Sequence, residues 1–199
     1  MRYAILSDLH GNEPALFAVR KRLQNVGAEH IVCLGDLVGY NPFPAACLKF
    51  ASEHCDLVIR GNHDKAVAIQ KTRFEMNEIA EAAIRWTQKK LSAQEVQLLA
   101  ELRAGPLLAE NGLLICHGTP IDEDRYLVNA IDAEDSFRYL SSYYPSIRLC
   151  AFGHTHVPLV VDEEGMSFCP QDGAAVKLSP NRRYLLNPGS VGQPRDGDS

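Results

Sequence analysis

Residues 30–44 read HIVCLGDLVGYNPFP, an apolar run followed by a loop rich in glycine, asparagine and proline. The apolar run, Ile31 to Leu34, is bounded by turn residues, which predicts a buried strand. Asp36 therefore stands where this strand gives way to a loop. In open α/β sheets, ligands bind beyond the carboxyl ends of the strands. Asp36 is thus a candidate ligand whose two oxygens can bridge two cations, and the alternative is that it starts a turn or caps a helix.

The same pattern, a strand followed by polar side chains, recurs four more times along the chain. These other strands end at Asp8 and His10, at Asn62 and His63, at His117, and at His154 and His156. If the strands share one direction, these groups meet at one edge. Five of the seven histidines lie there, which leaves His30 and His54 as ordinary surface or helix-end residues. Satisfied polar groups at a loop start would explain any single motif, but not five in this order.

The order of the predicted elements indicates an α/β fold. Strands expected over 2–7, 31–34 and 56–60 alternate with helices, which implies parallel pairing. Further along the chain, a hairpin is expected around Asn111-Gly112. The end of the chain predicts a β-meander of four short strands, over 157–161, 165–170, 174–178 and 182–186. Parallel strands followed by antiparallel ones predict two packed sheets with helices outside.

Residues 65–103 differ from the rest, because they are rich in Ala, Glu, Gln, Lys and Leu and contain no Gly or Pro. They predict two helices divided near Leu91-Ser92, where Ser92 and Glu95 fit a capping box. We expect a single domain over 1–199 that carries a helical, cap-like segment over about 65–103.

Composition limits the classes of function. The net charge of −5 argues against a broad nucleic-acid surface, but it allows a small phosphorylated substrate attracted by bound metal. The N-terminus does not resemble a signal peptide, and no apolar run approaches a membrane-spanning length. The six cysteines include no CxxC pair, so we expect free thiols and a reducing cytoplasm. An oligomer is compatible with these observations.

The types of candidate ligand point to a catalytic metal site. Asp, Asn and His without thiolate suit Mn²⁺, Fe or Zn²⁺ rather than a cysteine-based structural zinc. The ligands are too many for one ion, whereas two ions roughly 3.5–4 Å apart that share Asp36 would use them well. An extended His154-Thr155-His156 would direct both imidazoles to the same face. Such a pair of ions would supply hydroxide for in-line attack on phosphorus.

These motifs carry a family resemblance that extends from Arg2 to Gly192. The chain resembles the calcineurin-like metallophosphoesterase superfamily at Asp8-x-His10, Gly35-Asp36, Gly61-Asn62-His63-Asp64, His117-Gly118 and Gly153-His154-x-His156. Two further stretches resemble its small bacterial and archaeal phosphodiesterase-like branch, namely Gly39-Tyr40-Asn41-Pro42 and Asn187-Pro188-Gly189-Ser190.

The resemblance implies a four-layer α-β-β-α sandwich, with two mixed β-sheets flanked by helices and a dimetal centre. It implies one metal held by Asp8, His10, Asp36 and His156. It implies a second metal held by Asp36, Asn62, His117 and His154. His63 would bind the substrate phosphate, with Asn62 beside it, and would protonate the leaving group. We expect Mn²⁺ in both sites, with Fe, Zn²⁺ or Ni²⁺ as alternatives.

We therefore expect a dimetal-dependent phosphoesterase that hydrolyses a small phosphodiester or nucleotide. A dinucleoside polyphosphate hydrolase is one alternative, with Tyr40, Phe43 and Tyr126 as candidates for adenine stacking. A protein phosphatase-like enzyme is another. The related protein phosphatases carry Asp and Arg where this chain has Gly39 and Tyr40, which disfavours a phosphoprotein substrate and leaves Asp64 as the candidate to orient His63. A non-catalytic metal-binding scaffold is the remaining alternative.

Overall fold

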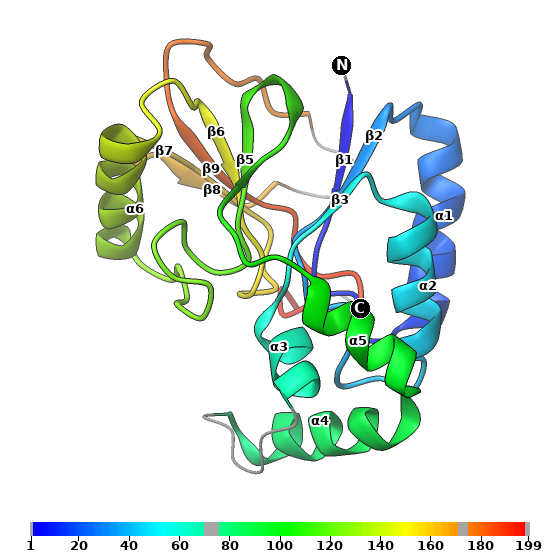
Figure 1. The fold of residues 1–199 in the computed structure, drawn as a ribbon. Coiled ribbons are helices and arrows are strands. Elements are labelled where there is room, and N and C mark those ends of the chain that lie inside the picture. The colour runs from blue at the N-terminus through cyan, green and yellow to red at the C-terminus, as the bar shows by residue number, and fades with distance from the viewer. Residues whose placement is uncertain (1, 70–75, 171–174, 198–199) are drawn as a thin grey trace.

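The computed structural model describes residues 2–69, 76–170 and 175–197, whose strands form two sheets that face each other (Figure 1). The smaller sheet is parallel, in the order β1-β2-β3, and consists of β1 (Tyr3–Leu6), β2 (His30–Cys33) and β3 (Leu57–Val58). The larger sheet has the order β4-β5-β6-β9-β7-β8. Its strands are β4 (Leu107–Leu108), β5 (Leu113–Ile115), β6 (Leu149–Ala151), β7 (Leu159–Asp162), β8 (Ser167–Phe168) and β9 (Tyr184–Asn187).

Helices cover the outer face of each sheet, so the layers run helix, sheet, sheet, helix (Figure 1). Helices α1 (Glu13–Val26) and α2 (Pro44–His54) lie beside the smaller sheet, and α6 (Ala130–Tyr143) lies beside the larger one. Three apolar clusters match these layers. The cluster of residues from both sheets contains Val32, Leu34, Ile59, Ala109, Leu113, Ile115 and Ala151. The predicted α/β sandwich is thereby confirmed.

The larger sheet is mixed, and its strand order corrects one prediction. Strands β5, β6 and β9 are parallel, whereas β4 and β7 run antiparallel to their neighbours. The predicted strand over 174–178 is wrong for residues 175–178, while Ala174 and the turn expected at Gln171–Gly173 lie outside the described residues. The physical reason is the place of β9, whose two neighbours are β6 and β7, so the segment before β9 cannot pair with it as a meander strand would.

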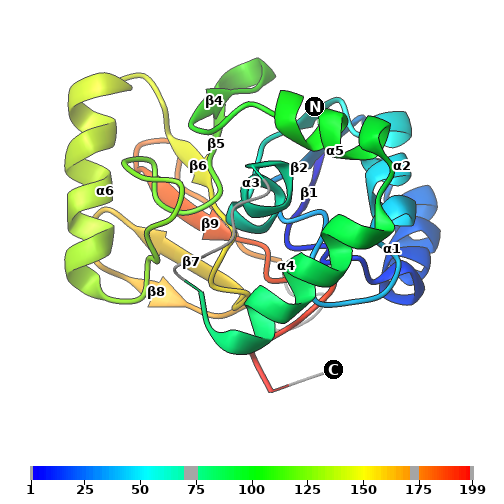
Figure 2. The same cartoon turned by 60° about the horizontal axis from the view of Figure 1, so that its bottom comes forward.

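Three helices follow β3, where two were predicted. Helix α3 (Asn62–Ile69) begins directly at the Asn62-His63 motif, and α4 (Glu78–Lys90) and α5 (Ala93–Glu101) follow. The predicted division at Leu91-Ser92 and the capping box of Ser92 with Glu95 are confirmed. Figure 1 shows α3 below the two sheets, and Figure 2, in which that side comes forward, shows α3 in front of them with α4 and α5 nearby. The position of α3 brings the start of that helix to the edge where the strands end.

The structure contains the predicted hairpin around Asn111-Gly112, and its cysteine thiols are free, as the sequence indicates. Strands β4 and β5 pair antiparallel around Asn111, which adopts a left-handed conformation with φ 56°. All six cysteines lie in the described residues and are free, and Cys33, Cys116 and Cys150 are buried. None of the helices within the described ranges is both long enough and apolar enough to cross a membrane.

Candidate metal centre

Every side chain that the sequence singled out lies at one edge of the two sheets. Asp8 and His10 follow β1, Asp36 follows β2, His117 follows β5, and the loop after β6 carries two more histidines. Two groups of these side chains could each hold a metal ion, because within each group the ligand atoms lie within 4.8 Å of one another. The first consists of Asp8, His10, Asp36 and His156, and the second consists of Asp36, His117 and His154. All six residues are buried.

Asn62 and His63 adjoin the second group from the start of α3. The side-chain oxygen of Asn62 lies 3.1 Å from Nε2 of His117, so it is placed beside the nitrogen that would face a cation. The structure thus brings all the predicted site residues together. His30 and His54 lie elsewhere, with His30 near Asp56 and His54 packed against Phe50.

The backbone of these loops is strained at the residues that carry the candidate ligands. Seven non-glycine residues of the described ranges have positive φ, and six of them are Asp8, His10, Asp36, Tyr40, His154 and His156, at 44° to 66°. Each such conformation costs on the order of 1–3 kcal/mol and persists only where surrounding contacts impose it. Contacts with the loop after β2 hold Asp8 and His10 in this conformation, since their amides donate to the carbonyls of Gly35 and Asp36.

This finding corrects the expected extended conformation of His154-Thr155-His156. Both histidines are left-handed, and the amide of Thr155 donates to the carbonyl of Gly153 in a tight turn. The two imidazoles nevertheless reach the centre, one in each group. Local residue spacing could not reveal this backbone, because contacts from distant loops impose it.

Asp36 lies between the two groups. Its Oδ2 atom is 3.5 Å from Nε2 of His10 and 3.5 Å from Nε2 of His117. Its Oδ1 atom accepts the backbone N–H of His63 at 2.9 Å. A single carboxylate oxygen therefore faces one histidine of each group, which is the placement that a ligand shared by two cations requires.

The two carboxylate oxygens of Asp8 differ in their hydrogen bonds. Its Oδ2 atom accepts hydrogen bonds from the Ser7 hydroxyl at 2.6 Å and the His154 amide at 3.1 Å. Its Oδ1 atom is buried without a hydrogen-bond partner, 3.3 Å from Nε2 of His156. Buried carboxylate oxygens are rarely left unpaired. A bound cation would satisfy Oδ1, so the donor set fits a divalent metal.

Backbone carbonyls fix the tautomers of the histidines. A carbonyl oxygen only accepts, so the ring nitrogen beside it must carry the proton. Nδ1 donates to the carbonyls of Val38, Leu34 and Gln193 in His10, His117 and His156, at 3.0, 2.7 and 2.6 Å respectively. In His154 the Nε2 atom donates to the carbonyl of Asp124 at 3.2 Å. The other nitrogen of each ring is the candidate metal ligand, an arrangement common in metal sites, and in His117 that nitrogen also lies 3.1 Å from the side-chain oxygen of Asn62.

The charges of the cluster also suit a cation. Burial raises the pKa of the Asp36 and Asp8 carboxyls, but neighbouring histidines outweigh it and lower both pKa values, that of Asp36 strongly. Burial lowers the pKa of His10 to about 3 and that of His154 to about 4. Burial also acts to lower the pKa of His117, but Asp36 dominates and raises it to about 10. The cluster therefore holds anionic carboxylates and two neutral imidazoles, and His117 would have to lose a proton before its Nε2 atom could bind a cation.

Packing, and not Asp64, holds the ring of His63. The ring is buried, and its centroid lies 4.8 Å from that of His10 and 4.7 Å from that of Tyr40. Its Nδ1 atom has no hydrogen-bond partner. Gly39 permits this packing, because a Cβ atom there would clash with Nδ1 of His63. The expectation that Asp64 orients His63 finds no support in the hydrogen bonds of Asp64.

Asp64 instead anchors the loop that follows Asp36. It is fully buried, and its carboxylate accepts the amides of Leu37, Val38 and Gly61 at 2.9, 3.3 and 3.0 Å. Burial and the charge of Asp36 raise its pKa to about 7. Sequence reasoning missed this role, because the amides that Asp64 accepts lie in two separate loops.

We expect Asp64→Ala to lower the free energy of unfolding by about 3 kcal/mol or more, because it leaves three buried amides without an acceptor. Urea unfolding of the metal-free protein measures the effect. Asp56→Ala is the matched control. Asp56 also accepts an amide, that of Ile31 at 2.8 Å, but its side chain is 55% exposed and water can replace it. Equal stabilities of the two variants would contradict the anchoring role of Asp64.

A second loop supports the centre from the other side. The carbonyl of Asp124 orients His154, and the ring of Tyr126 stacks on that histidine with the ring centroids 3.8 Å apart. Glu123 ties the loop to the rest of the fold through ion pairs with Arg60 at 3.0 Å and Lys65 at 2.6 Å. These contacts were not predicted from the sequence, which shows only an acidic loop.

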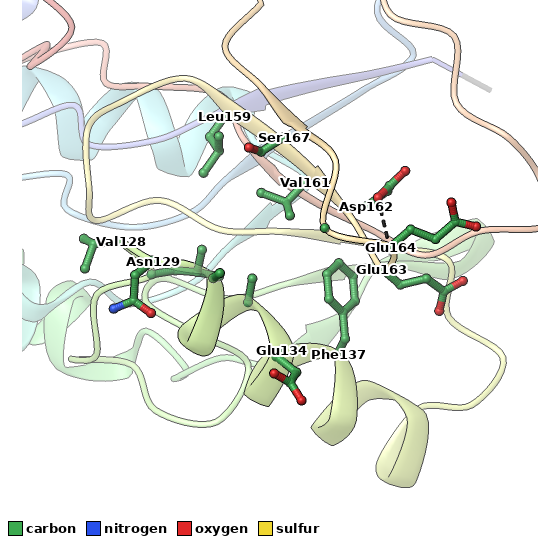
Figure 3. Close-up of a pocket in the computed structure, with 14 residues that line it drawn as sticks. Val128, Asn129, Glu134, Phe137, Leu159, Val161, Asp162, Glu163, Glu164 and Ser167 are labelled. Carbon is green, nitrogen blue, oxygen red and sulfur yellow. Dashed lines mark hydrogen bonds between the residues drawn. The ribbon is translucent and has the colours of Figure 1, made fainter.

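The molecule also has a cavity of about 490 Å³ between α6 and strands β7 and β8 (Figure 3). Its wall is largely apolar, with Phe137, Leu159 and Val161 pointing inward. None of the candidate ligands lines it. All of its acidic residues are paired with arginines: Glu134 with Arg138, Asp162 and Glu164 with Arg182, and Glu163 with Arg183. It therefore offers no reactive group, and the chemistry belongs to the cluster at the sheet edge.

Comparison with known proteins agrees with this geometry. The family model of the calcineurin-like phosphoesterase superfamily domain matches residues 1–199. An uncharacterized protein of Methanocaldococcus jannaschii, MJ0912, is 34% identical over 200 residues, covering 98% of this chain and 77% of the relative. A metallophosphoesterase crystal structure from Sphaerobacter thermophilus is 35% identical, with a TM-score of 0.83 over 100% of this chain and 80% of that one. The hypothetical protein PH1004 from Pyrococcus horikoshii shares the fold, with 21% identity and a TM-score of 0.72 over 96% and 77% of the two chains.

Proposed function

Because the chain belongs to the calcineurin-like phosphoesterase superfamily, and is thus a metal-dependent phosphoester hydrolase, we propose that it uses two metal ions to hydrolyse a small phosphodiester or nucleotide. The observation that carries this proposal is the placement of Asp36 Oδ2 at 3.5 Å from a histidine of each ligand group. We propose Mn²⁺ for both ions, because the oxygen and imidazole donors suit it.

The two groups divide the metals as the resemblance implies. Asp8, His10 and His156 would hold one ion, Asn62, His117 and His154 the other, and Asp36 would contact both. A pair of divalent ions supplies hydroxide near neutral pH and stabilises charge on the phosphoryl oxygens. The carbonyls behind the histidines keep the ligand nitrogens aimed at the centre, which limits reorganisation during the reaction.

His63 is the residue that would act on the substrate itself. Its amide donates to Asp36, so the start of α3 is fixed relative to the proposed shared ligand. Its ring lies beside His10 and has an unpartnered Nδ1. We assign to it the binding of the phosphate and the donation of a proton to the leaving group, with the amide of Asn62 as a second contact to the substrate.

Hydrolysis assays on metal-stripped protein test this function. Bis-p-nitrophenyl phosphate and p-nitrophenyl phosphate are assayed side by side, before and after addition of Mn²⁺. We expect turnover of the diester that depends on added metal. Turnover of the monoester alone would replace the phosphodiesterase with a phosphatase. Absence of turnover with either compound, in protein that binds two ions, would contradict the enzyme and favour the scaffold.

One observation favours a dinucleoside polyphosphate hydrolase as a second candidate. Tyr126 stacks on His154 and is still 44% exposed, so an adenine could stack beside the centre. Phe43 is exposed to the same extent but has no ring contact with the candidate ligands. If this candidate is correct, Tyr126→Ala will raise the KM for diadenosine tetraphosphate and leave that for bis-p-nitrophenyl phosphate unchanged.

A further inference from the structure

The basic residues around the centre differ in what their side chains contact. Arg60 and Lys65 form ion pairs with Glu123, and Arg125 forms ion pairs with two aspartates of α6. The charge of each is therefore compensated by a carboxylate. Arg195 contrasts with them, since its guanidinium contacts the side-chain oxygen of Gln193 at 3.0 Å and the hydroxyl of Tyr40, both neutral groups.

The segment that carries Arg195 is fixed against the metal-ligand loops. Figure 1 shows this C-terminal segment at the edge where β1 ends. The hydroxyl of Ser190 and the amide of Gly192 both donate to the carbonyl of Asp8, at 2.9 and 2.8 Å. The carbonyl of Gln193 accepts from His156 at 2.6 Å, and the amide of Arg195 donates to the carbonyl of His156 at 3.2 Å. The position of the Arg195 backbone is thus set by two candidate metal ligands.

Tyr40 connects Arg195 to the interior of the site. Its ring is half-buried, with its centroid 4.7 Å from those of His10 and His63. Its backbone is left-handed, with φ 57°. Its hydroxyl is hydrogen-bonded to the guanidinium of Arg195. A neutral hydroxyl and a permanent cation therefore stand together beside the proposed proton donor.

We propose that Arg195 and Tyr40 form an anion-binding pair that contacts a non-bridging oxygen of the substrate phosphoryl group. This inference rests on the proposed function, because it assumes that the phosphate binds at the metal centre. Arg195 is exposed, its guanidinium carries donors, and it forms no ion pair within the part of the chain that the structure describes, so its charge is available to an anion. Tyr40 would hold the guanidinium toward the centre and contribute its own hydroxyl. The pair is a binding device, so it acts on KM and on phosphate affinity more than on kcat.

The test compares Arg195→Gln, Arg195→Lys and Tyr40→Phe in metal-loaded protein. Inorganic phosphate is titrated by calorimetry, and KM and kcat are measured with bis-p-nitrophenyl phosphate. Hydrogen bonds to charged groups are worth enough to weaken phosphate binding by about 10-fold or more in Arg195→Gln. We expect a partial rescue by Arg195→Lys, which keeps the charge, and a smaller loss in Tyr40→Phe. Unchanged phosphate affinity in Arg195→Gln, with full metal content, would overturn the proposal.

Arg22→Gln is the matched control, because Arg22 is an exposed arginine on α1, toward the end of the helix that lies opposite the centre. This variant should match the wild type in phosphate affinity and in KM. The experiment separates the pair from the proposed function. If the wild type hydrolyses the diester and Arg195→Gln equals it in both measurements, the proposed anion-binding pair is wrong and the proposed function is retained. If the wild type binds phosphate but hydrolyses neither nitrophenyl ester, the proposed function is wrong. The anion-binding pair is then tested by the phosphate affinity of Arg195→Gln relative to the wild type.

Discussion

Replacing Asp36 by Asn will lower kcat/KM for a phosphodiester by at least about 10³-fold, the upper range for losing one electrostatic contact to a transition state. The change removes the negative charge that lies between the two ligand groups. It keeps an oxygen that can accept the amide of His63, so the local fold should survive. The affinity for both metal ions should fall together, because each ion loses the same ligand. Elemental analysis after equilibrium dialysis measures the metal content beside the activity.

A buried aspartate outside the centre provides the control for this variant. Asp162 is also buried, but it lies in β7 and pairs with Arg182 at 2.9 Å. Asp162→Asn should retain two ions and most of the activity. If Asp36→Asn still binds two equivalents of metal as tightly as the wild type, Asp36 is not a shared ligand.

His63→Ala should lower kcat by about 10²–10⁴-fold, the usual contribution of a positioned general acid. Metal content should stay at the wild-type level, because His63 belongs to neither ligand group. The loss should be larger for a nucleoside diester than for p-nitrophenyl esters, since p-nitrophenolate leaves readily without a proton. Steady-state kinetics on both substrate types, with metal analysis of the same samples, measure the two effects.

His54→Ala is the control for a histidine removed elsewhere, because His54 ends α2 and packs against Phe50. It should leave kcat and the leaving-group dependence unchanged. An equal loss of kcat for good and poor leaving groups in His63→Ala would exclude proton donation by His63. Full activity of His63→Ala would exclude any catalytic part for it.

The sequence predicted the layers and the set of residues at the sheet edge, because both depend on local patterns. The run Ile31 to Leu34 indicates a strand by its length and its turn residues, and Asp36 follows it directly. The Ser92 capping box also appears as predicted, because it depends on residues three apart in sequence. The division of ligands into two groups came from the family resemblance and not from spacing.

Features set by distant contacts could not be predicted. The left-handed backbone of His154 and His156 depends on packing between loops, and residue spacing favoured an extended segment. The insertion of β9 between β6 and β7 is a matter of topology, and the meander pattern does not encode it. The carbonyls that orient the histidines have no side-chain signature. Likewise, Tyr40 and Arg195 are far apart in sequence and meet only in the fold.

Anomalous diffraction from crystals soaked in Mn²⁺ tests the central claim most directly. We predict two manganese peaks roughly 3.5–4 Å apart, the separation of two-metal sites. One should contact Asp8, His10 and His156, the other should contact Asn62, His117 and His154, and Oδ2 of Asp36 should touch both. A single peak, or two peaks of which only one contacts Asp36, would contradict the dimetal centre described here.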